Sequence, residues 1–231
     1  MIVTPIKNRK GYVQLLGKSF EFLRVYDTAD VHLFDDDSSE FSIADLQRWF
    51  PRAKISSVSQ SQADRSTREA FQYFLSEAKH DILVCLDSDG LLHPKWASFI
   101  YSTLPESDGV LSLYNSAAHP SSSCNEGNCR KDSAGALGMV FTRELITRLF
   151  MDPDVREADL FDWALVHKLN EFGIQFLVPP DSLILHFGMY GAHGSGQQHP
   201  DRENSFDLHP YPQHLKKSVV AFLKGKNPSS L

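Results

Sequence analysis

The stretch Ile82-Leu83-Val84-Cys85-Leu86-Asp87-Ser88-Asp89-Gly90 determines how we read this 231-residue chain. Its first five residues form an uninterrupted apolar run, which is typical of a strand covered on both faces of its sheet. Two acidic residues follow directly, where the strand would reach its carboxyl end. Ligands of wound α/β sheets bind beyond those ends. The stretch therefore predicts a buried strand that delivers carboxylates to a site.

The preceding segments alternate between strand and helix patterns. Residues 2–4 and 31–34 read as short strands, the first of them stopped by Pro5. Apolar residues at helical spacing predict helices over 12–25 and 63–78. This alternation predicts an α/β fold, with a mainly parallel, Rossmann-like central sheet flanked by helices. We find no repeat or linker, so one domain over residues 1–231 is the simplest organisation.

The second half of the chain is less regular. Strands are predicted at 109–114, 135–141 and 182–187. Thr142 offers an N-cap for one helix, and a second helix covers 160–172, with Asp159 as its cap and Gly173 as its stop. A short basic amphipathic helix is expected at 215–223.

The net charge and the hydropathy pattern limit which kinds of partner, nucleic acid or membrane, this chain is expected to bind. The net charge of −6 argues against binding nucleic acid by general electrostatics. No apolar run approaches the ~20 residues that span a bilayer, and the first residues lack a signal pattern, so we expect a cytoplasmic protein. The helix at 215–223 either contacts a membrane peripherally or is an ordinary solvated helix with one apolar stripe.

The three cysteines do not form a disulfide framework. Cys85 lies within the apolar run and reads as a small core residue. Cys124 and Cys129 flank a polar Asn-Glu-Gly-Asn segment. Two thiols are too few for a zinc site, and a bridge between them needs an oxidising compartment. We expect both to be reduced.

Carboxylates follow two of the predicted strands: Asp35, Asp36 and Asp37 after the second, and Asp87 and Asp89 after the third. In extended chain, Asp87 and Asp89 point to the same side. Like charges raise one another's pKa, and a divalent cation relieves this repulsion while binding a diphosphate. The other interpretation is a simple turn of Asp and Gly90. The position after the most hydrophobic strand favours the ligand site.

These segments carry a resemblance to a known family. Val3-Thr4-Pro5 with Asn8-Arg9, Asp36-Asp37-Ser38-Ser39 and Leu86-Asp87-Ser88-Asp89 resemble successive signatures of GT-A glycosyltransferases of the large inverting class. The resemblance implies that Asp36 lies near the nucleoside of a nucleotide-sugar, with Asp35 and Asp37 as alternatives. It implies further donor-binding roles for Pro5, Arg9, Asp87, Ser88 and Asp89. Arg65 either faces the donor or is a surface residue.

The resemblance extends into the second half. Gly135 and Ala136 resemble the small-residue segment beside the donor sugar, and Phe161-Asp162-Trp163 resembles the family's Glu-Asp pair. Phe161 departs from that pattern, so the role of general base rests on Asp162. An acid in the first turn of a helix also has a purely stabilising explanation. The resemblance divides the chain into a nucleotide-sugar-binding half (1–108), an acceptor and catalytic half with a flap (109–214), and a terminal helix and tail (215–231).

Five histidines fall after residue 185, and His186 ends the last predicted strand. It resembles the histidine that completes the metal site of many GT-A enzymes, which implies Mn²⁺ or Mg²⁺ bound by Asp87, Asp89 and His186. The alternative is a core histidine, and His193 is the second choice of ligand. Residues 188–209 are expected to form a flap that excludes water. Trp96 and Trp163 each either stack on a sugar ring or are buried.

We therefore expect a metal-dependent glycosyltransferase that moves a sugar from a nucleoside-diphosphate sugar to an acceptor hydroxyl, inverting the anomeric centre in one displacement. The acceptor, whether carbohydrate, lipid-linked or protein, is not indicated. A metal-dependent hydrolase of a phosphate or sugar substrate is one alternative. A non-catalytic nucleotide-sugar-binding module is another, since the acid missing at Phe161 leaves room for it.

Overall fold

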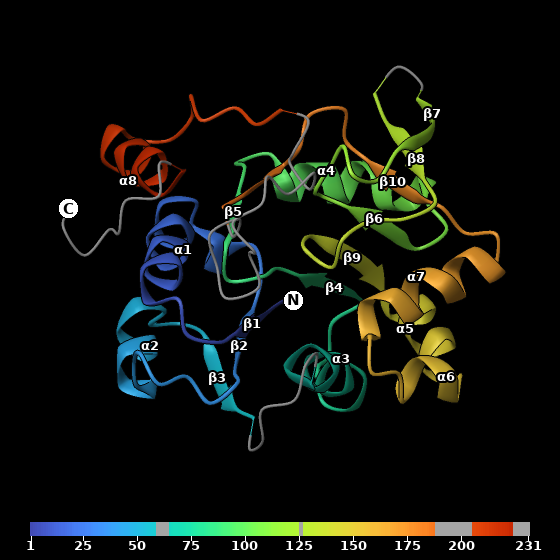
Figure 1. Cartoon of the computed structure of the whole chain (residues 1–231), viewed down its shortest axis with the longest axis horizontal. Helices are drawn as coiled ribbons and strands as arrows, with labels where there is room; N and C mark the ends of the chain where they lie inside the picture. Colours follow the sequence, from blue (N-terminus) through green and yellow to red (C-terminus); the bar gives the residue numbers. More distant parts are fainter. Residues whose placement is uncertain (59–64, 125–126, 188–204, 224–231) are drawn as a thin grey trace.

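The computed structural model describes residues 1–58, 65–124, 127–187 and 205–223. A nine-stranded sheet in the order β3-β2-β1-β4-β9-β6-β10-β8-β7 runs through the molecule, with a two-stranded sheet β11-β5 beside it (Figure 1). The strands are β1 Ile2–Ile6, β2 Val31–Asp35, β3 Lys54–Ser57, β4 Ile82–Cys85, β5 Gly90–Leu92, β6 Val110–Ser112, β7 Ser121–Cys124, β8 Cys129–Lys131, β9 Met139–Thr142, β10 Phe176–Val178 and β11 Ile184–His186.

Helices cover both faces of the large sheet. They are α1 Lys10–Phe22, α2 Ile43–Trp49, α3 Arg65–Ser76, α4 Trp96–Thr103, α5 Arg143–Phe150, α6 Pro153–Arg156, α7 Phe161–Glu171 and α8 Gln213–Leu223, with short 3-10 turns at Val25–Asp27 and Leu104–Glu106. Side chains of β1 alternate between two cores, with Ile2 packed among α1, α2 and α4 and Val3 among α3, α5 and α7. None of the described helices is long and apolar enough to cross a bilayer.

The parallel part of the sheet confirms the predicted α/β fold. β3, β2, β1 and β4 are parallel neighbours, and β1 lies between the two strands that end in acidic residues. Seven of the nine strands run in one direction, because only β8 and β9 oppose the rest. The carboxyl ends of β1, β2 and β4 therefore meet at one edge.

The structure differs from the sequence prediction at three points: the end of β1, the start of β9 and the cap of α7. Pro5 does not stop β1: pairing with β2 continues through Pro5 and Ile6, while pairing with β4 has already ended at Val3, so the missing N–H leaves the ladder intact. Residues 135–138 precede β9 as a loop rather than beginning it. Thr142 caps α5 as predicted, but α7 is preceded by Leu160 with no side-chain cap, so the role given to Asp159 is wrong.

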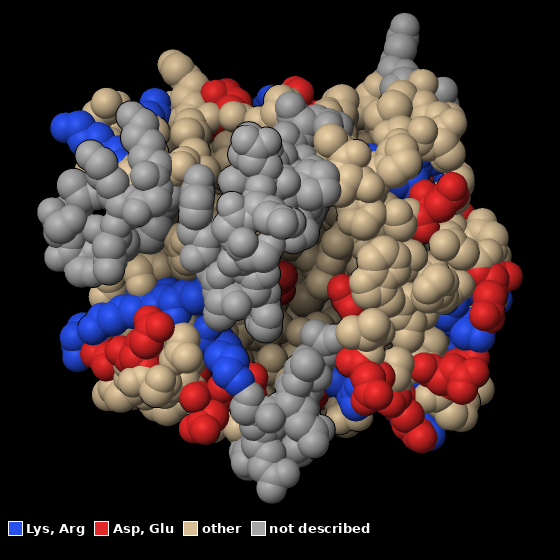
Figure 2. Space-filling view, in the orientation of Figure 1, with Lys and Arg blue, Asp and Glu red and all other residues tan. Residues whose placement is uncertain are grey.

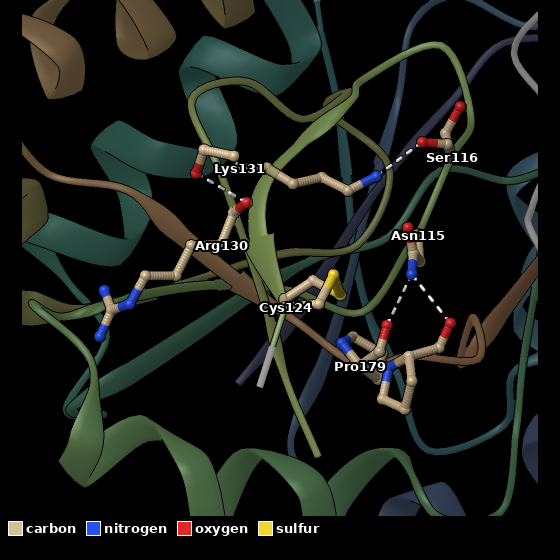
Figure 3. Close-up of a disulfide and its surroundings, with 9 residues drawn as sticks. Asn115, Ser116, Cys124, Arg130, Lys131 and Pro179 are labelled. Carbon is tan, nitrogen blue, oxygen red and sulfur yellow. Dashed lines mark hydrogen bonds between the residues drawn. A yellow bond between two sulfur atoms is a disulfide. The ribbon is translucent and has the colours of Figure 1, made fainter. Parts of the chain in front are cut away.

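The cysteines also differ from expectation. Cys124 and Cys129 are joined by a disulfide across the β7–β8 hairpin (Figure 3). The two residues are directly opposite in the hairpin, with Cα atoms 4.1 Å apart, so strand pairing brings together thiols that we expected to be separate. Cys85 is buried and free, as predicted. Near the hairpin, Lys131 donates to the carbonyl of Ser116 at 2.6 Å.

His32 in β2 gives the fold an acid-sensitive point. Its ring stacks on Phe34, with centroids 4.1 Å apart, and meets Tyr73 edge-on at 4.4 Å. Burial lowers the pKa of His32 from 6.5 to about 4. Between pH 6.5 and 4 the His32 ring is protonated in the unfolded chain but neutral in the folded one. The free energy of unfolding therefore decreases as the pH falls through this range.

We expect His32→Gln to remove this dependence. Between pH 7 and pH 4 the parent should lose about 3 kcal/mol more unfolding free energy than the variant, measured by urea titration at each pH. The amide of glutamine can still reach Ser56, which lies 2.8 Å from His32 Nε2. Parallel pH profiles for parent and variant would contradict this assignment.

Candidate active site

The Asp87-Ser88-Asp89 segment forms a turn at the end of β4. The Gly90 amide donates to the carbonyl of Asp87 at 3.1 Å, and Ser88 and Asp89 lie within the turn. The expectation that the two aspartates share one side of an extended chain is therefore wrong. A Cβ on Gly90 would lie 2.7 Å from a methyl of Leu137, so any larger residue here would have to displace that side chain. The turn leaves Asp89 buried at 4% exposure.

The two aspartates affect each other's ionisation. Burial, followed by the charge of Asp89, raises the pKa of Asp87 to about 7. Burial also opposes ionisation of Asp89, but the adjacent His186 ring and the charge of Arg9 outweigh it and lower the pKa of Asp89. Asp89 is thus the firmly charged member of the pair, and Asp87 is near its protonation midpoint at neutral pH.

Arg9 supplies the counter-charge of Asp89. Its guanidinium forms an ion pair with Asp89 Oδ2 across 80 residues of sequence. The backbone of Arg9 is left-handed, with φ of 61°, at the start of α1. The resemblance implied a position in the loop beside the base; the described contact of Arg9 joins the end of β1 to the end of β4.

His186 lies over the same carboxylate. β11 pairs antiparallel with β5, and His186 is opposite Gly90 in the register. The Nε2 atom of His186 is 3.6 Å from Asp89 Oδ2, and the amide of Phe187 donates to the carbonyl of Asp89 at 3.1 Å. The predicted last strand therefore forms, but in the small sheet, and it brings His186 beside Asp89.

The acidic cluster after β2 is anchored beside this turn. Asp35 and Asp36 are buried, while Asp37 is exposed with a left-handed φ of 54°. Lys7 forms an ion pair with Asp36 at 3.1 Å. Burial raises the pKa of Asp35. Of the three alternatives, Asp36 is the one linked to the loop after β1, which also contains Arg9; Pro5, at the end of that strand, is half-buried.

Asn8 holds the two loops together, a role that no local sequence pattern indicates. Its amide donates to Ser38 Oγ at 2.9 Å, and its side-chain oxygen accepts from the Ser39 amide at 2.8 Å. Asn8 adopts a left-handed φ of 55°, which asparagine tolerates better than most residues. The loops that follow β1 and β2 therefore form one connected edge.

Asp162 belongs to α7, in the second half of the chain. It is half-buried in the first turn of α7, and its Oδ1 accepts from the Trp163 amide at 2.8 Å. Its charge is the smallest contribution to the raised pKa of Asp87, after burial and the charge of Asp89, so the two carboxylates are close enough to interact. Figure 2 shows a hollow in the middle of this face with acidic side chains along it.

Phe161 has a packing reason to depart from the family pattern. Its ring is fully buried, 5.1 Å from that of Phe71 and 5.6 Å from that of Phe150. Arg68 of α3 donates to the Ala158 carbonyl and lies over the Phe161 ring at 5.9 Å. Arg68 thereby fixes the segment that precedes α7, a positioning role that the sequence did not indicate.

The Gly135-Ala136 loop lies against the end of β4. Gly138 donates to the carbonyl of Cys85 at 2.8 Å, and its φ of 80° turns the chain into β9. A Cβ on Gly135 would meet nothing closer than His119 Nε2 at 3.9 Å. Gly135 and Ala136, both half-buried, thus lie on the segment that leads to the site.

Other predicted residues are only partly placed. Arg65 begins α3, but its side chain lies outside the described residues, as do His193 and positions 188–204 of the expected flap. Trp96 is buried at 5% exposure, which confirms the core alternative for that residue. Trp163 is 49% exposed beside Asp162, so of these two tryptophans it alone remains available to a sugar ring.

Asp87, Asp89 and His186 do not form a complete set of metal ligands as they are arranged here. Among the described residues, no group of three or more His, Cys, Asp or Glu side chains is arranged to hold an ion. Asp89 Oδ2 is already contacted by Arg9 and His186. In favour of a cation, burial and then the charge of Asp89 raise the pKa of Asp87, and a bound ion would favour the ionised carboxylate. A metal would therefore require Asp89 to change partners.

Residues 1–121 match the family model described as glycosyl transferase family 2. A search of curated proteins finds no match. Among solved structures, S. aureus TarS 1-349 in complex with UDP is 15% identical with a TM-score of 0.56, covering 77% of this chain and 56% of that one. The complex of TarS 1-349 with UDP-GlcNAc is 14% identical with a TM-score of 0.54, covering 77% and 54%. This chain thus spans little more than half of those TarS chains, and the likeness shows a shared fold. Since the family model covers more than half of its 231 residues, the chain belongs to glycosyl transferase family 2.

Proposed function

We propose that this protein transfers a sugar from a nucleoside-diphosphate sugar to an acceptor hydroxyl, with inversion at the anomeric carbon. The observation that carries the proposal is the convergence of side chains from separate segments on one sheet edge. Asp89 meets Arg9 and His186, Asp36 lies on the adjoining loop, and the charge of Asp162 acts on Asp87. Family membership supports the transferase class, and the titles of the TarS structures make UDP the first nucleotide to test.

Each group has a defined role in this proposal. The loops that carry Arg9 and Asp36 bind the nucleotide, and Gly135 allows the sugar to approach the backbone because little fills the space above it. Asp162 accepts the proton of the acceptor hydroxyl as that oxygen attacks the anomeric carbon and the diphosphate leaves. Asp87, Asp89 and His186 would hold Mn²⁺ or Mg²⁺, which when bound neutralises charge on the departing diphosphate.

A panel of nucleotide-sugars tests the proposal without a known acceptor. With Mn²⁺ present, one donor should be hydrolysed slowly and should be protected by its own nucleoside diphosphate. Adding acceptor candidates should then raise turnover well above hydrolysis, because water is the poorer substrate of a site built for transfer. The anomer formed, followed by NMR, reports inversion.

Other results of the same panel would support the competing functions. Hydrolysis that no acceptor accelerates favours a metal-dependent hydrolase. Tight donor binding without any turnover favours a binding module. Binding of no nucleotide-sugar in the panel would overturn the proposal.

A further inference from the structure

Charge is unevenly distributed along this acidic chain. Residues 208–231 contain Lys216, Lys217, Lys224 and Lys226 and no aspartate or glutamate. The whole chain has a net charge of −6, so residues 1–207 carry −10 and the remaining segment carries +4. The described part of this basic segment includes α8, whose place in the fold shows which side chains face outward.

One side of α8 is fixed in the molecule. Leu215 and Val219 are buried in a small core with Leu15 of α1 and Leu185 of β11. Figure 1 shows α8 beside α1 at the periphery, away from the middle of the large sheet. Because β11 also carries His186, α8 is attached directly to an element of the candidate site.

A flank of α8 combines exposed apolar side chains with two lysines, of which Lys216 is half-buried and Lys217 exposed. Lys216, Val220 and Leu223 are spaced i, i+4 and i+7 and therefore share one side of the helix. Val220 is 40% exposed and Leu223 is 38% exposed, and Lys217 is exposed on the next position round. Next to the start of α8, Phe22 is 41% exposed, with its ring 5.5 Å from that of Tyr211.

This combination fits an anionic lipid surface. Apolar side chains enter the boundary between headgroups and acyl chains, while neighbouring lysines are attracted to lipid phosphates. A nucleic acid would use the lysines but would gain nothing from the exposed Val220 and Leu223. We propose that the α8 flank, made of Lys216, Lys217, Val220 and Leu223, docks this protein on anionic membranes. The proposal does not depend on the assigned reaction.

Vesicle flotation of the full chain tests it. The protein should float with phosphatidylcholine vesicles that contain about 30 mol% phosphatidylglycerol and stay behind with pure phosphatidylcholine. Binding should weaken at about 0.5 M salt, where the Debye length falls to a few ångströms. Lys216→Glu/Lys217→Glu and, separately, Val220→Asp should each lower the partition coefficient at least about tenfold.

Matched variants separate position from bulk charge. Lys79→Glu/Lys95→Glu changes net charge equally at two other exposed lysines, and Met151→Asp places a carboxylate at a side chain that is 78% exposed. Both should bind vesicles like the parent. UDP affinity, measured in the same samples, should be unchanged in all variants, so the donor proposal is judged separately. No binding to anionic vesicles, or equal loss in Lys79→Glu/Lys95→Glu, would overturn the docking proposal.

Discussion

Asp89→Ala should weaken nucleoside diphosphate binding by at least about 100-fold in the presence of Mn²⁺, as measured by calorimetry with UDP first. Asp89 is the side chain on which Arg9 and His186 both converge, and its lowered pKa keeps it charged at neutral pH. Its removal deletes the anchor for a cation and leaves the partly buried guanidinium of Arg9 without that partner. Removing one partner of a buried, charge-assisted contact typically costs several kcal/mol of binding free energy.

Two controls accompany this variant. Asp108→Ala removes an exposed carboxylate on another loop and should leave affinity unchanged. Asp89→Asn keeps the shape of the side chain, so a loss of binding in that variant, with the thermal melting of the parent, separates charge from misfolding. If Asp89→Ala binds as tightly as the parent, the assignment of the donor site is wrong.

Asp162→Asn should lower the rate of transfer by about 10²–10⁴-fold, the range expected for loss of a general base. The asparagine oxygen can still accept from the Trp163 amide, so the first turn of α7 should be retained. Donor affinity should stay within about threefold of the parent, because a group that acts on the acceptor contributes to the transition state and not to donor binding.

The control for this variant is Asp159→Asn, three residues earlier and exposed. Net charge changes equally in both variants, but only Asp162 lies in the first turn of α7 and is among the charges that raise the pKa of Asp87. Comparable rates for the Asp162 variant and the parent would transfer the base role to another group. An equal fall in donor affinity and rate would instead indicate a binding role for Asp162.

The predictable parts of the fold are those with a strong local pattern. The apolar run before Asp87 predicted β4, and the carboxylates after it and after β2 proved to lie on one edge because β1 pairs with both strands. α2 was missed although Ser42 and Asp45 form a capping box, because its seven residues offer little periodicity. β3 was missed because its residues are mostly polar and partly exposed at the edge of the sheet.

The contacts that complete the site are non-local and have no local signal. Arg9 and Asp89 are 80 residues apart, and their pairing depends on the left-handed start of α1. The strand ending in His186 was predicted, but its pairing with β5 follows from how the second half packs. Similarly, the disulfide could be predicted only by knowing that β7 and β8 pair antiparallel with Cys124 opposite Cys129.

The contact between Arg9 and Asp89 bears on how the unloaded protein differs from a loaded one. A buried carboxylate normally demands a cation, and this chain provides one from its own α1 start. Asp89 is therefore already paired with a cation from within the chain. Asp89 would hold a divalent ion only after separating from Arg9, and the guanidinium of Arg9 would then be available to the phosphates of a bound donor. Donor binding would then be an exchange of ionic partners, in which Arg9 pairs with Asp89 before the donor binds and with the donor phosphates afterwards.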